Sequence, residues 1–279
     1  YRLYAVASRA IKTRFPKLMV GGPSLGATGP VVDGRLKPTK FLTGFLSYCK
    51  EHKLPLDFFS WHTYTDNPYV YAQKARAIRK LLDEYGFQKT ENHLNEWNYL
   101  PDNDWRPMFV SGQGKMRQRW IEKMGGSHGA AFVTCALIYL QDSPLDVANY
   151  YSGDTSLFGL FNRFGVPKKT FHAMRAFQML MDTPLRLKTS GSKPGKTAVC
   201  AGISQDGTRA TILAGNFRSE DKEFSVLAEN VPWQGPTRWE VFRLDAKKNL
   251  TSTRSGTTTD RQLKLKVECS APCVLVIKL

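Results

Sequence analysis

The chain has 279 residues, of which 42% are hydrophobic and 12% aromatic. This length fits one large domain or two ordinary ones, and the composition excludes global disorder. The longest apolar run, residues 130–140, is too short to cross a bilayer, which takes about 20 residues.

The formal net charge is +16, which raises the alternative of a nucleic-acid-binding protein. The densest basic blocks, residues 74–80 and 115–119, both fall on amphipathic helical patterns, where a solvated basic face is the ordinary explanation. The other basic residues are spread along the chain without a recognisable nucleic-acid module. We therefore expect no nucleic-acid partner, and an acidic polysaccharide would be an equally good electrostatic partner.

The five cysteines and five histidines show no metal-ligand spacing, so we expect neither a metal nor a cofactor. Cys49 and Cys135 lie in apolar periodic stretches, as small core residues do. Cys200, Cys269 and Cys273 fall in a later β-rich region, where one disulfide among them is an open alternative.

The chain begins inside a predicted helix, residues 1–15, without Met, a signal peptide or a capping residue. We expect a fragment or a processed product of a longer protein. A secreted, periplasmic or lysosome-like location would follow if that protein carries a signal peptide, so the location stays open.

Strand, loop and helix then alternate four times before residue 184. The predicted strands are residues 18–20, 56–62, 92–96 and 130–139, and the helices that follow them are residues 38–49, 69–85, 108–124 and 170–180. The glycine turn at residues 21–24 lacks the Gly-Lys-Ser/Thr ending of a phosphate loop.

Polar side chains follow each predicted strand. These are Ser24, His62 with Tyr64, Asn95 with Glu96, and Asp142. In a parallel barrel the catalytic groups come from the carboxyl ends of different strands, so we expect these clusters to meet at one rim. A doubly wound open sheet is the competing fold, but it usually carries a glycine-rich first turn. The predicted fold class is α/β, with part of a (β/α)8 TIM-type barrel at residues 1–184.

After Pro184 the pattern changes to short strands between Gly, Asp, Asn, Ser and Pro turns, which predicts an antiparallel β-sandwich at residues 185–279. The predicted strands there are residues 199–204, 210–216, 224–227, 238–244, 263–267 and 273–279.

Glu96 stands beside Trp97 at the end of a predicted strand. A carboxylate in this setting suits nucleophilic attack on a sugar, and a flat indole ring can support an apolar sugar face. The alternative is a solvent-exposed loop glutamate beside a core tryptophan.

The order of motifs resembles the retaining glycoside hydrolases of clan A, most closely family 39, the β-xylosidase and α-L-iduronidase family. The matching stretches are residues 18–23, 58–64, 94–98, 158–161 and 165–169. The resemblance implies that residues 1–180 supply strands five to eight of the barrel and that a β-sandwich follows.

The resemblance also implies roles for single residues. Glu96 would be the nucleophile, after the seventh strand, and His62 and Tyr64 would line the sugar subsite, with Tyr64 bonded to the nucleophile. Asp142, after the eighth strand, would contact sugar hydroxyls. Asn95 joins Glu96 in the predicted substrate site, and Trp97 would be either a sugar platform or packing at the barrel mouth.

The family's acid/base glutamate lies in an Asn-Glu pair after the fourth strand, a segment that this chain lacks. Asp66 and Glu91 are nearby in sequence, but neither matches that position. A half-barrel also leaves two unpaired strand edges, so we expect it to pair with a second copy or an N-terminal half-barrel chain, or to be part of a longer protein.

The sequence leaves three candidate functions open. The first is a retaining glycosidase, or its nucleophile-bearing half, acting on a carbohydrate substrate. The second is a carbohydrate-binding or structural fragment without turnover. The third is nucleic-acid binding, which the scattered basic residues favour least.

Overall fold

The computed structural model describes residues 1–232, 235–259 and 261–279. Its contacts form two compact units that interleave along the chain. The first unit holds residues 1–64, 70–98 and 142–151, and the second holds residues 65–69, 99–141 and 152–279. This division differs from the single boundary expected near residue 184, because several helices before that point belong to the second unit.

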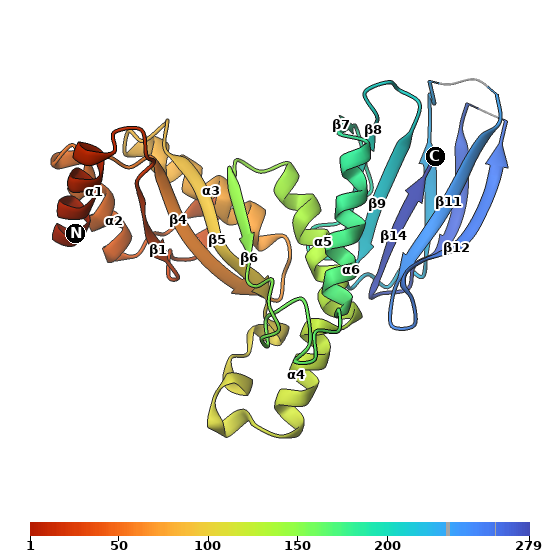
Figure 1. Ribbon diagram of the computed structural model, residues 1–279, viewed down its shortest axis with the longest axis horizontal. Helices are drawn as coiled ribbons and strands as arrows, with labels where there is room; N and C mark the ends of the chain where they lie inside the picture. The colour runs from red at the N-terminus through yellow and green to blue at the C-terminus, as the bar shows by residue number, and fades with distance from the viewer. Residues whose placement is uncertain (233–234, 260) are drawn as a thin grey trace. The chain divides into compact units, whose positions relative to one another are not determined.

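The first unit is built on a four-stranded sheet in the order β1-β4-β5-β6. The strands are β1 (Gly21–Leu25), β4 (Phe58–Thr65), β5 (Glu91–Tyr99) and β6 (Val147–Tyr150). β1 runs parallel to β4, and β5 runs parallel to β6. β1 and β6 form the edges of this sheet (Figure 1).

Three amphipathic helices accompany this sheet, together with a short hairpin of β2 (Val31–Val32) and β3 (Arg35–Leu36). They are α1 (Arg2–Arg14), α2 (Lys40–Glu51) and α3 (Val70–Glu84). α2 begins where the Thr39 hydroxyl accepts a hydrogen bond from the Leu42 amide, a typical N-cap. Figure 1 shows α1 and α2 side by side next to β1.

The second unit contains α4 (Lys115–Gly125), α5 (Ser127–Gln141) and α6 (Lys169–Gln178), with short 3-10 turns before α4 and after α6. α5 corrects the strand predicted at residues 130–139. Its residues are apolar on nearly every side, because α5 packs against α4, α6 and a β-sheet together. A helix buried all round shows no 3.6-residue periodicity, so its sequence resembles that of a buried strand.

The fourth strand of the parallel sheet is therefore β6, not residues 130–139. β6 has only four residues, Val-Ala-Asn-Tyr, and its burial does not alternate, so it carries little strand signal. The helix predicted at residues 108–124 is confined to α4, after three 3-10 turns.

The antiparallel part of the second unit is a six-stranded sheet in the order β12-β11-β14-β9-β8-β7 and a separate pair, β10-β13. The strands are β7 (Leu185–Leu187), β8 (Thr197–Ile203), β9 (Ala210–Asn216), β10 (Glu223–Ala228), β11 (Thr237–Leu244), β12 (Asn249–Thr258), β13 (Leu263–Glu268) and β14 (Cys273–Lys278). β7 and β12 were not expected from the sequence.

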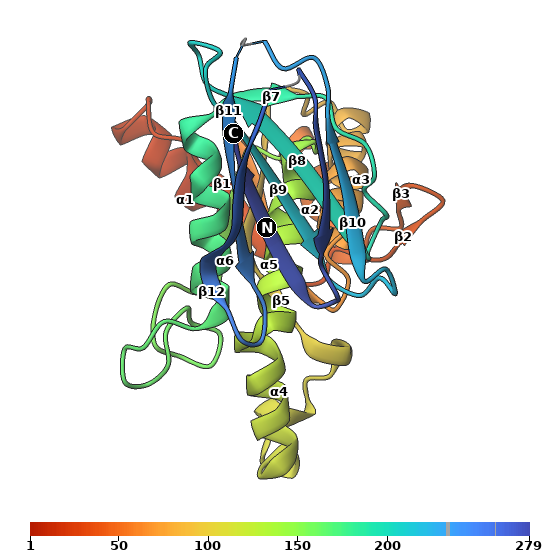
Figure 2. The same ribbon diagram turned by 90° about the vertical axis from the view of Figure 1, so that its right-hand side faces the viewer.

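The six-stranded sheet is covered on both faces. Leu263, Leu265 and Val267 of β13 pack into one apolar core with residues of β11 and β14. α5 and α6 lie on the other face, behind the strands in Figure 2, which views this sheet face-on. A parallel sheet with helices followed by antiparallel sheets confirms the coarse α/β prediction.

All five cysteines are buried and none is in a disulfide, including the three for which one was an open alternative. Within the described residues, no helix is long and apolar enough to cross a membrane.

Candidate active site

Glu96 lies at a β-bulge in β5. Leu94 pairs with Ala148 of β6 and Trp97 pairs with Tyr150, so two residues of β5 stand opposite one of β6. Burial alternates along β5 up to Leu94, and then Asn95 and Glu96 are both partly exposed. Bulges often re-aim side chains beside active sites, because the extra residue shifts the phase of the strand.

The two faces of the sheet differ in polarity around this bulge. On one face, Asn92 of β5 accepts a hydrogen bond from the Trp61 indole of β4 at 2.7 Å and donates to the Ala75 carbonyl of α3. On the other face, the ring of His93 stacks on Phe58. Glu96 is hydrogen-bonded to a side chain of β4, and Asn95 to a side chain of β1. Both residues therefore lie on this second face.

The hydroxyl of Tyr64 donates a hydrogen bond to Glu96 Oε2 at 2.8 Å. Burial, and then this hydrogen bond, raise the pKa of Tyr64 well above its usual range. The phenol therefore keeps its proton at every working pH and acts as a fixed donor. A carboxylate held by such a donor is oriented for in-line attack by its other oxygen.

His62 lies two residues before Tyr64, on the same face of β4. A methyl group placed on Gly26 would come within 2.6 Å of His62 Nε2, so the loop after β1 presses directly against the ring. The Nδ1 atom of His62 is buried and has no hydrogen-bond partner among the described residues. A buried ring nitrogen without a partner is uncommon in native proteins, and a water or a ligand hydroxyl can supply the missing hydrogen bond.

Asn95 reaches β1, where its Nδ2 atom donates to Ser24 Oγ at 2.7 Å. Ser24 is itself a bulge residue with φ of 58°, and its amide donates to Ser60 Oγ. The Oδ1 atom of Asn95 is buried and unpartnered within the described part of the chain. Two unpartnered polar atoms, one on β5 itself and one on the neighbouring β4, thus accompany the Glu96 carboxylate within the described residues.

Glu91 cannot supply a second carboxyl beside Glu96. Five residues of β-strand separate them, about 16 Å at about 3.3 Å per residue, whereas a retaining pair stands about 5–5.5 Å apart. Glu91 instead bonds the ring of His93 at 2.7 Å. Asp66, in the second unit, is engaged by Asn103 and Arg218.

The family described as "Glycosyl hydrolases family 39" matches residues 1–200. The chain belongs to this family. Two β-xylosidases are similar to it: that of Geobacillus stearothermophilus, 27% identical over 65% of this chain and 37% of its own length, and that of Caldicellulosiruptor saccharolyticus, 27% identical over 64% and 36%. The chain thus spans little more than a third of these family 39 relatives.

Two solved structures are also similar to this chain, and it again covers only part of their length. A glucosidase from Croceicoccus marinus is 25% identical, with a TM-score of 0.77 over 99% of this chain and 63% of that one. An α-L-arabinofuranosidase from Thermotoga maritima is 16% identical, with a TM-score of 0.63 over 100% and 61%. The second likeness concerns the fold alone.

Trp97 is buried in this family 39 chain, with 1% of its surface exposed. Its ring packs edge-on against Tyr71 of α3 and Tyr150 of β6, at centroid distances of 5.5 and 5.1 Å. A ring with no exposed face cannot support a sugar, so its burial contradicts the predicted platform and agrees with the packing alternative.

Asp142 does not follow the last parallel strand. It precedes β6, and the neighbouring Asp146 carboxylate accepts a hydrogen bond from the Asn92 amide at the amino end of the sheet. The predicted position was wrong because residues 130–139 form α5 rather than the strand. The residue that follows β6 is Tyr151, which was not among the predicted site residues.

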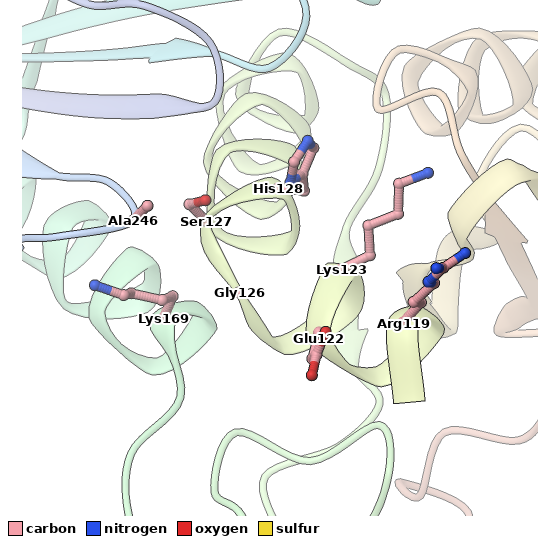
Figure 3. A pocket seen from close by; sticks show the side chains of 8 residues that line it. All are labelled: Arg119, Glu122, Lys123, Gly126, Ser127, His128, Lys169 and Ala246. Atoms are coloured by element: carbon pink, nitrogen blue, oxygen red, sulfur yellow. The ribbon is translucent and has the colours of Figure 1, made fainter. Parts of the chain in front are cut away.

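Within the described ranges, no group of three or more His, Cys, Asp or Glu side chains is placed to hold a metal ion. A basic hollow in the second unit contains Arg119, Lys123, His128 and Lys169 (Figure 3). Lys123 and Lys169 extend in opposite directions there, Lys123 pairs with Asp102, and Lys169 donates to the Lys248 carbonyl. The cations therefore do not converge on one anion.

Proposed function

We propose that this chain carries the nucleophile of a retaining glycosidase and that Glu96 is that nucleophile. The hydrogen bond from Tyr64 to Glu96, on the bulged strand and beside orphaned polar atoms of His62 and Asn95, carries the proposal. A sugar in this place would offer hydroxyl groups to both orphaned atoms, while one Glu96 oxygen faces its anomeric carbon. The β-xylosidase relatives favour a xyloside as substrate.

In the proposed reaction, a Glu96 oxygen forms a bond to the anomeric carbon as the bond to the leaving oxygen breaks. The leaving oxygen takes the electron pair and receives a proton from an acid/base carboxyl. Water then attacks the glycosyl-enzyme, gives its proton to the same carboxyl and releases Glu96. His62 and Asn95 would bind sugar hydroxyls through both steps.

We propose that the acid/base carboxyl belongs to a part of the barrel outside strands β1, β4, β5 and β6. The edges of this sheet at β1 and β6, and the exposed side chains of Leu3 and Val6 on α1 (82% and 70% exposed), support a covering polypeptide. Either an N-terminal half-barrel or a second copy would cover them. Light scattering of the purified chain measures its oligomeric state. A monomer would count against the second copy.

A dinitrophenyl 2-deoxy-2-fluoroxyloside tests the nucleophile in this chain. Dinitrophenolate leaves without a proton, so the first step needs the nucleophile but not the acid. We expect peptide mass spectrometry to find the fluoroxylosyl group on Glu96, and the corresponding glucoside to label more slowly. Glu96→Gln should abolish labelling, whereas Glu91→Gln, on the same strand, should retain it.

The second candidate is a carbohydrate-binding module without turnover. It is favoured by one observation, that Glu91, the other carboxyl of β5, is bound to His93 and too far along the strand to act beside Glu96. This candidate predicts saccharide binding that survives Glu96→Gln, together with no covalent label on the wild-type chain. A label on any residue other than Glu96 would remove the proposed nucleophile.

A further inference from the structure

Lys74 of α3 is a largely buried lysine whose ammonium group is held by two hydroxyl groups. It donates a hydrogen bond to Thr63 Oγ1 on β4 at 3.0 Å and lies 3.5 Å from Thr28 Oγ1, in the loop between β1 and β2. Burial lowers the pKa of Lys74, and within the described residues no carboxylate forms an ion pair with it. Lysine is seldom buried without a counter-ion, because removing the charge from water costs free energy. A neutral side chain of similar size would fill this position at lower cost.

The two hydroxyl groups belong to the two segments that adjoin His62. Thr63 directly follows His62 on β4, so its side chain points to the opposite face of the sheet, toward α3. Thr28 lies two residues after Gly26, whose backbone leaves no room for a methyl group beside the His62 ring. Thr28 is fully buried, and its carbonyl accepts a hydrogen bond from the Thr39 amide at 3.2 Å. The ammonium group thus ties the loop after β1 to the strand that carries His62.

The two ends of this link differ in how firmly their backbones are held. β4 lies between β1 and β5 in the sheet, so it has a strand partner on both sides. Residues 26–30 lie between β1 and β2 and belong to no strand. A hydrogen bond from a charged donor is stronger than one between neutral groups. Its loss should therefore displace the loop more than the strand, and with the loop the His62 ring.

We infer that Lys74 is a positioning residue that, through Thr28 and Gly26, holds the His62 ring where it can meet a sugar hydroxyl. Lys74 does not touch the sugar, because it contacts the face of β4 opposite to Tyr64 and Glu96. The inference rests on the proposed glycosidase function, in which His62 binds the sugar and Glu96 attacks it. Loss of Lys74 should therefore weaken sugar binding and spare the chemical step.

Labelling kinetics with the dinitrophenyl fluoroxyloside test this role, because they separate the inactivator concentration for half-maximal rate from the maximal rate. Lys74→Met keeps the length of the side chain and removes its donors. It should raise that concentration about five-fold, the effect of weakening one hydrogen bond to the sugar, and change the maximal rate less than about two-fold. Thr28→Val, which lacks the acceptor, should act in the same direction. Thr28→Ser, which keeps it, and Lys80→Met, an exposed lysine on α3, should behave like wild type.

The position of the His62 ring can also be followed without any reaction. In the proton NMR spectrum, with the His62 signals assigned from the spectrum of His62→Gln, the ring protons of His62 should shift in Lys74→Met and in Thr28→Val. They should stay in place in Thr28→Ser and Lys80→Met. Circular dichroism of each variant shows whether it is folded.

Two results would overturn the inference alone. In one, folded Lys74→Met and Thr28→Val match wild type in both labelling constants. In the other, they lower only the maximal rate, which would place the effect at Tyr64 and Glu96. If Lys74→Met does not fold, the comparison of Thr28→Val with Thr28→Ser decides, since both keep Lys74. A wild-type chain that is not labelled at Glu96 would instead refute the proposed function, while the His62 signals would still test the link from Lys74 to the ring.

Discussion

The phenol of Tyr64 on β4 and the carboxylate of Glu96 on β5 are joined by a 2.8 Å hydrogen bond between neighbouring strands. Hydrogen bonds to charged groups contribute about 1.5–3 kcal/mol. If this bond orients the nucleophile, Tyr64→Phe should slow the maximal rate of fluoroxyloside labelling about 10- to 100-fold, with little change in the half-maximal concentration. Tyr48→Phe, on α2, is the control, and an unchanged rate in Tyr64→Phe would remove the orienting role.

Asn92 holds the middle of the first unit together. It is fully buried, accepts from the Trp61 indole at 2.7 Å and donates to the carbonyls of Ala75 and Pro144 at 3.0 and 2.9 Å. Asn92→Ala would remove these three hydrogen bonds and leave the buried Trp61 indole N–H without its acceptor, so we expect a loss of about 3 kcal/mol in the free energy of unfolding. Urea unfolding followed by tryptophan fluorescence measures it.

The matched control for this change is Gln73→Ala, an exposed amide on α3. We expect its urea midpoint to equal that of wild type. An Asn92→Ala midpoint as high as that of the control would mean that water replaces the lost hydrogen bonds.

The number of cysteine thiols that react with a thiol reagent can be measured in the native and the unfolded chain. Burial raises the pKa of both Cys49 and Cys135 to about 12, so at pH 8 almost no reactive thiolate forms at either. We expect the native chain to react with almost no Ellman reagent and the chain unfolded in guanidinium without reductant to react at five thiols. Three thiols in the unfolded chain would reveal a disulfide.

Asp206 makes the stability of the second unit depend on pH. Hydrogen bonds from the Ser204 hydroxyl, and then from the amide and hydroxyl of Thr208, lower the pKa of Asp206 to about 2. A carboxyl whose pKa is lowered on folding stabilises the fold above its unfolded pKa of about 3.9, and this contribution is lost as the pH falls toward 2. Asp206→Asn should lower the urea midpoint at pH 7.

That difference between Asp206→Asn and wild type should shrink between pH 4 and pH 2.5. Glu229→Gln, an exposed acidic residue in the same unit, should show no such trend. A difference that is constant over this pH range would mean that the amide replaces the carboxylate fully and that the charge contributes nothing.

Most of the first unit could be predicted from the sequence because its helices are amphipathic and the central strand β4 begins with the apolar pair Phe58 and Phe59. The 3.6-residue pattern places α3 within one residue of its expected ends. α5 could not be predicted in this way, because neighbours on every side remove the polar stripe that marks a helix. This error misplaced the fourth parallel strand in the prediction. It therefore also misplaced Asp142, which was expected to follow that strand.

The candidate active site, like the first unit, could be predicted only in part from the sequence. The motif around Glu96 and the His-x-Tyr stretch indicated three residues that the structure brings to one face, two of which are hydrogen-bonded. The bulge at Asn95 and Glu96 could not be read from residue types, since it depends on the register of β5 against β6. For this reason Trp97 is buried against Tyr71 and Tyr150 and does not lie on the face of Glu96.

Asn95 and Glu96 share one face of the sheet because β5 holds one residue more than β6 over this stretch. Deleting Asn95 would restore strict alternation and leave Glu96 and Trp97 on their present faces. Loss of this single codon would therefore keep the carboxylate in place and remove only the amide that reaches Ser24. The extra residue widens the polar surface beside Glu96 without turning the neighbouring indole out of the core.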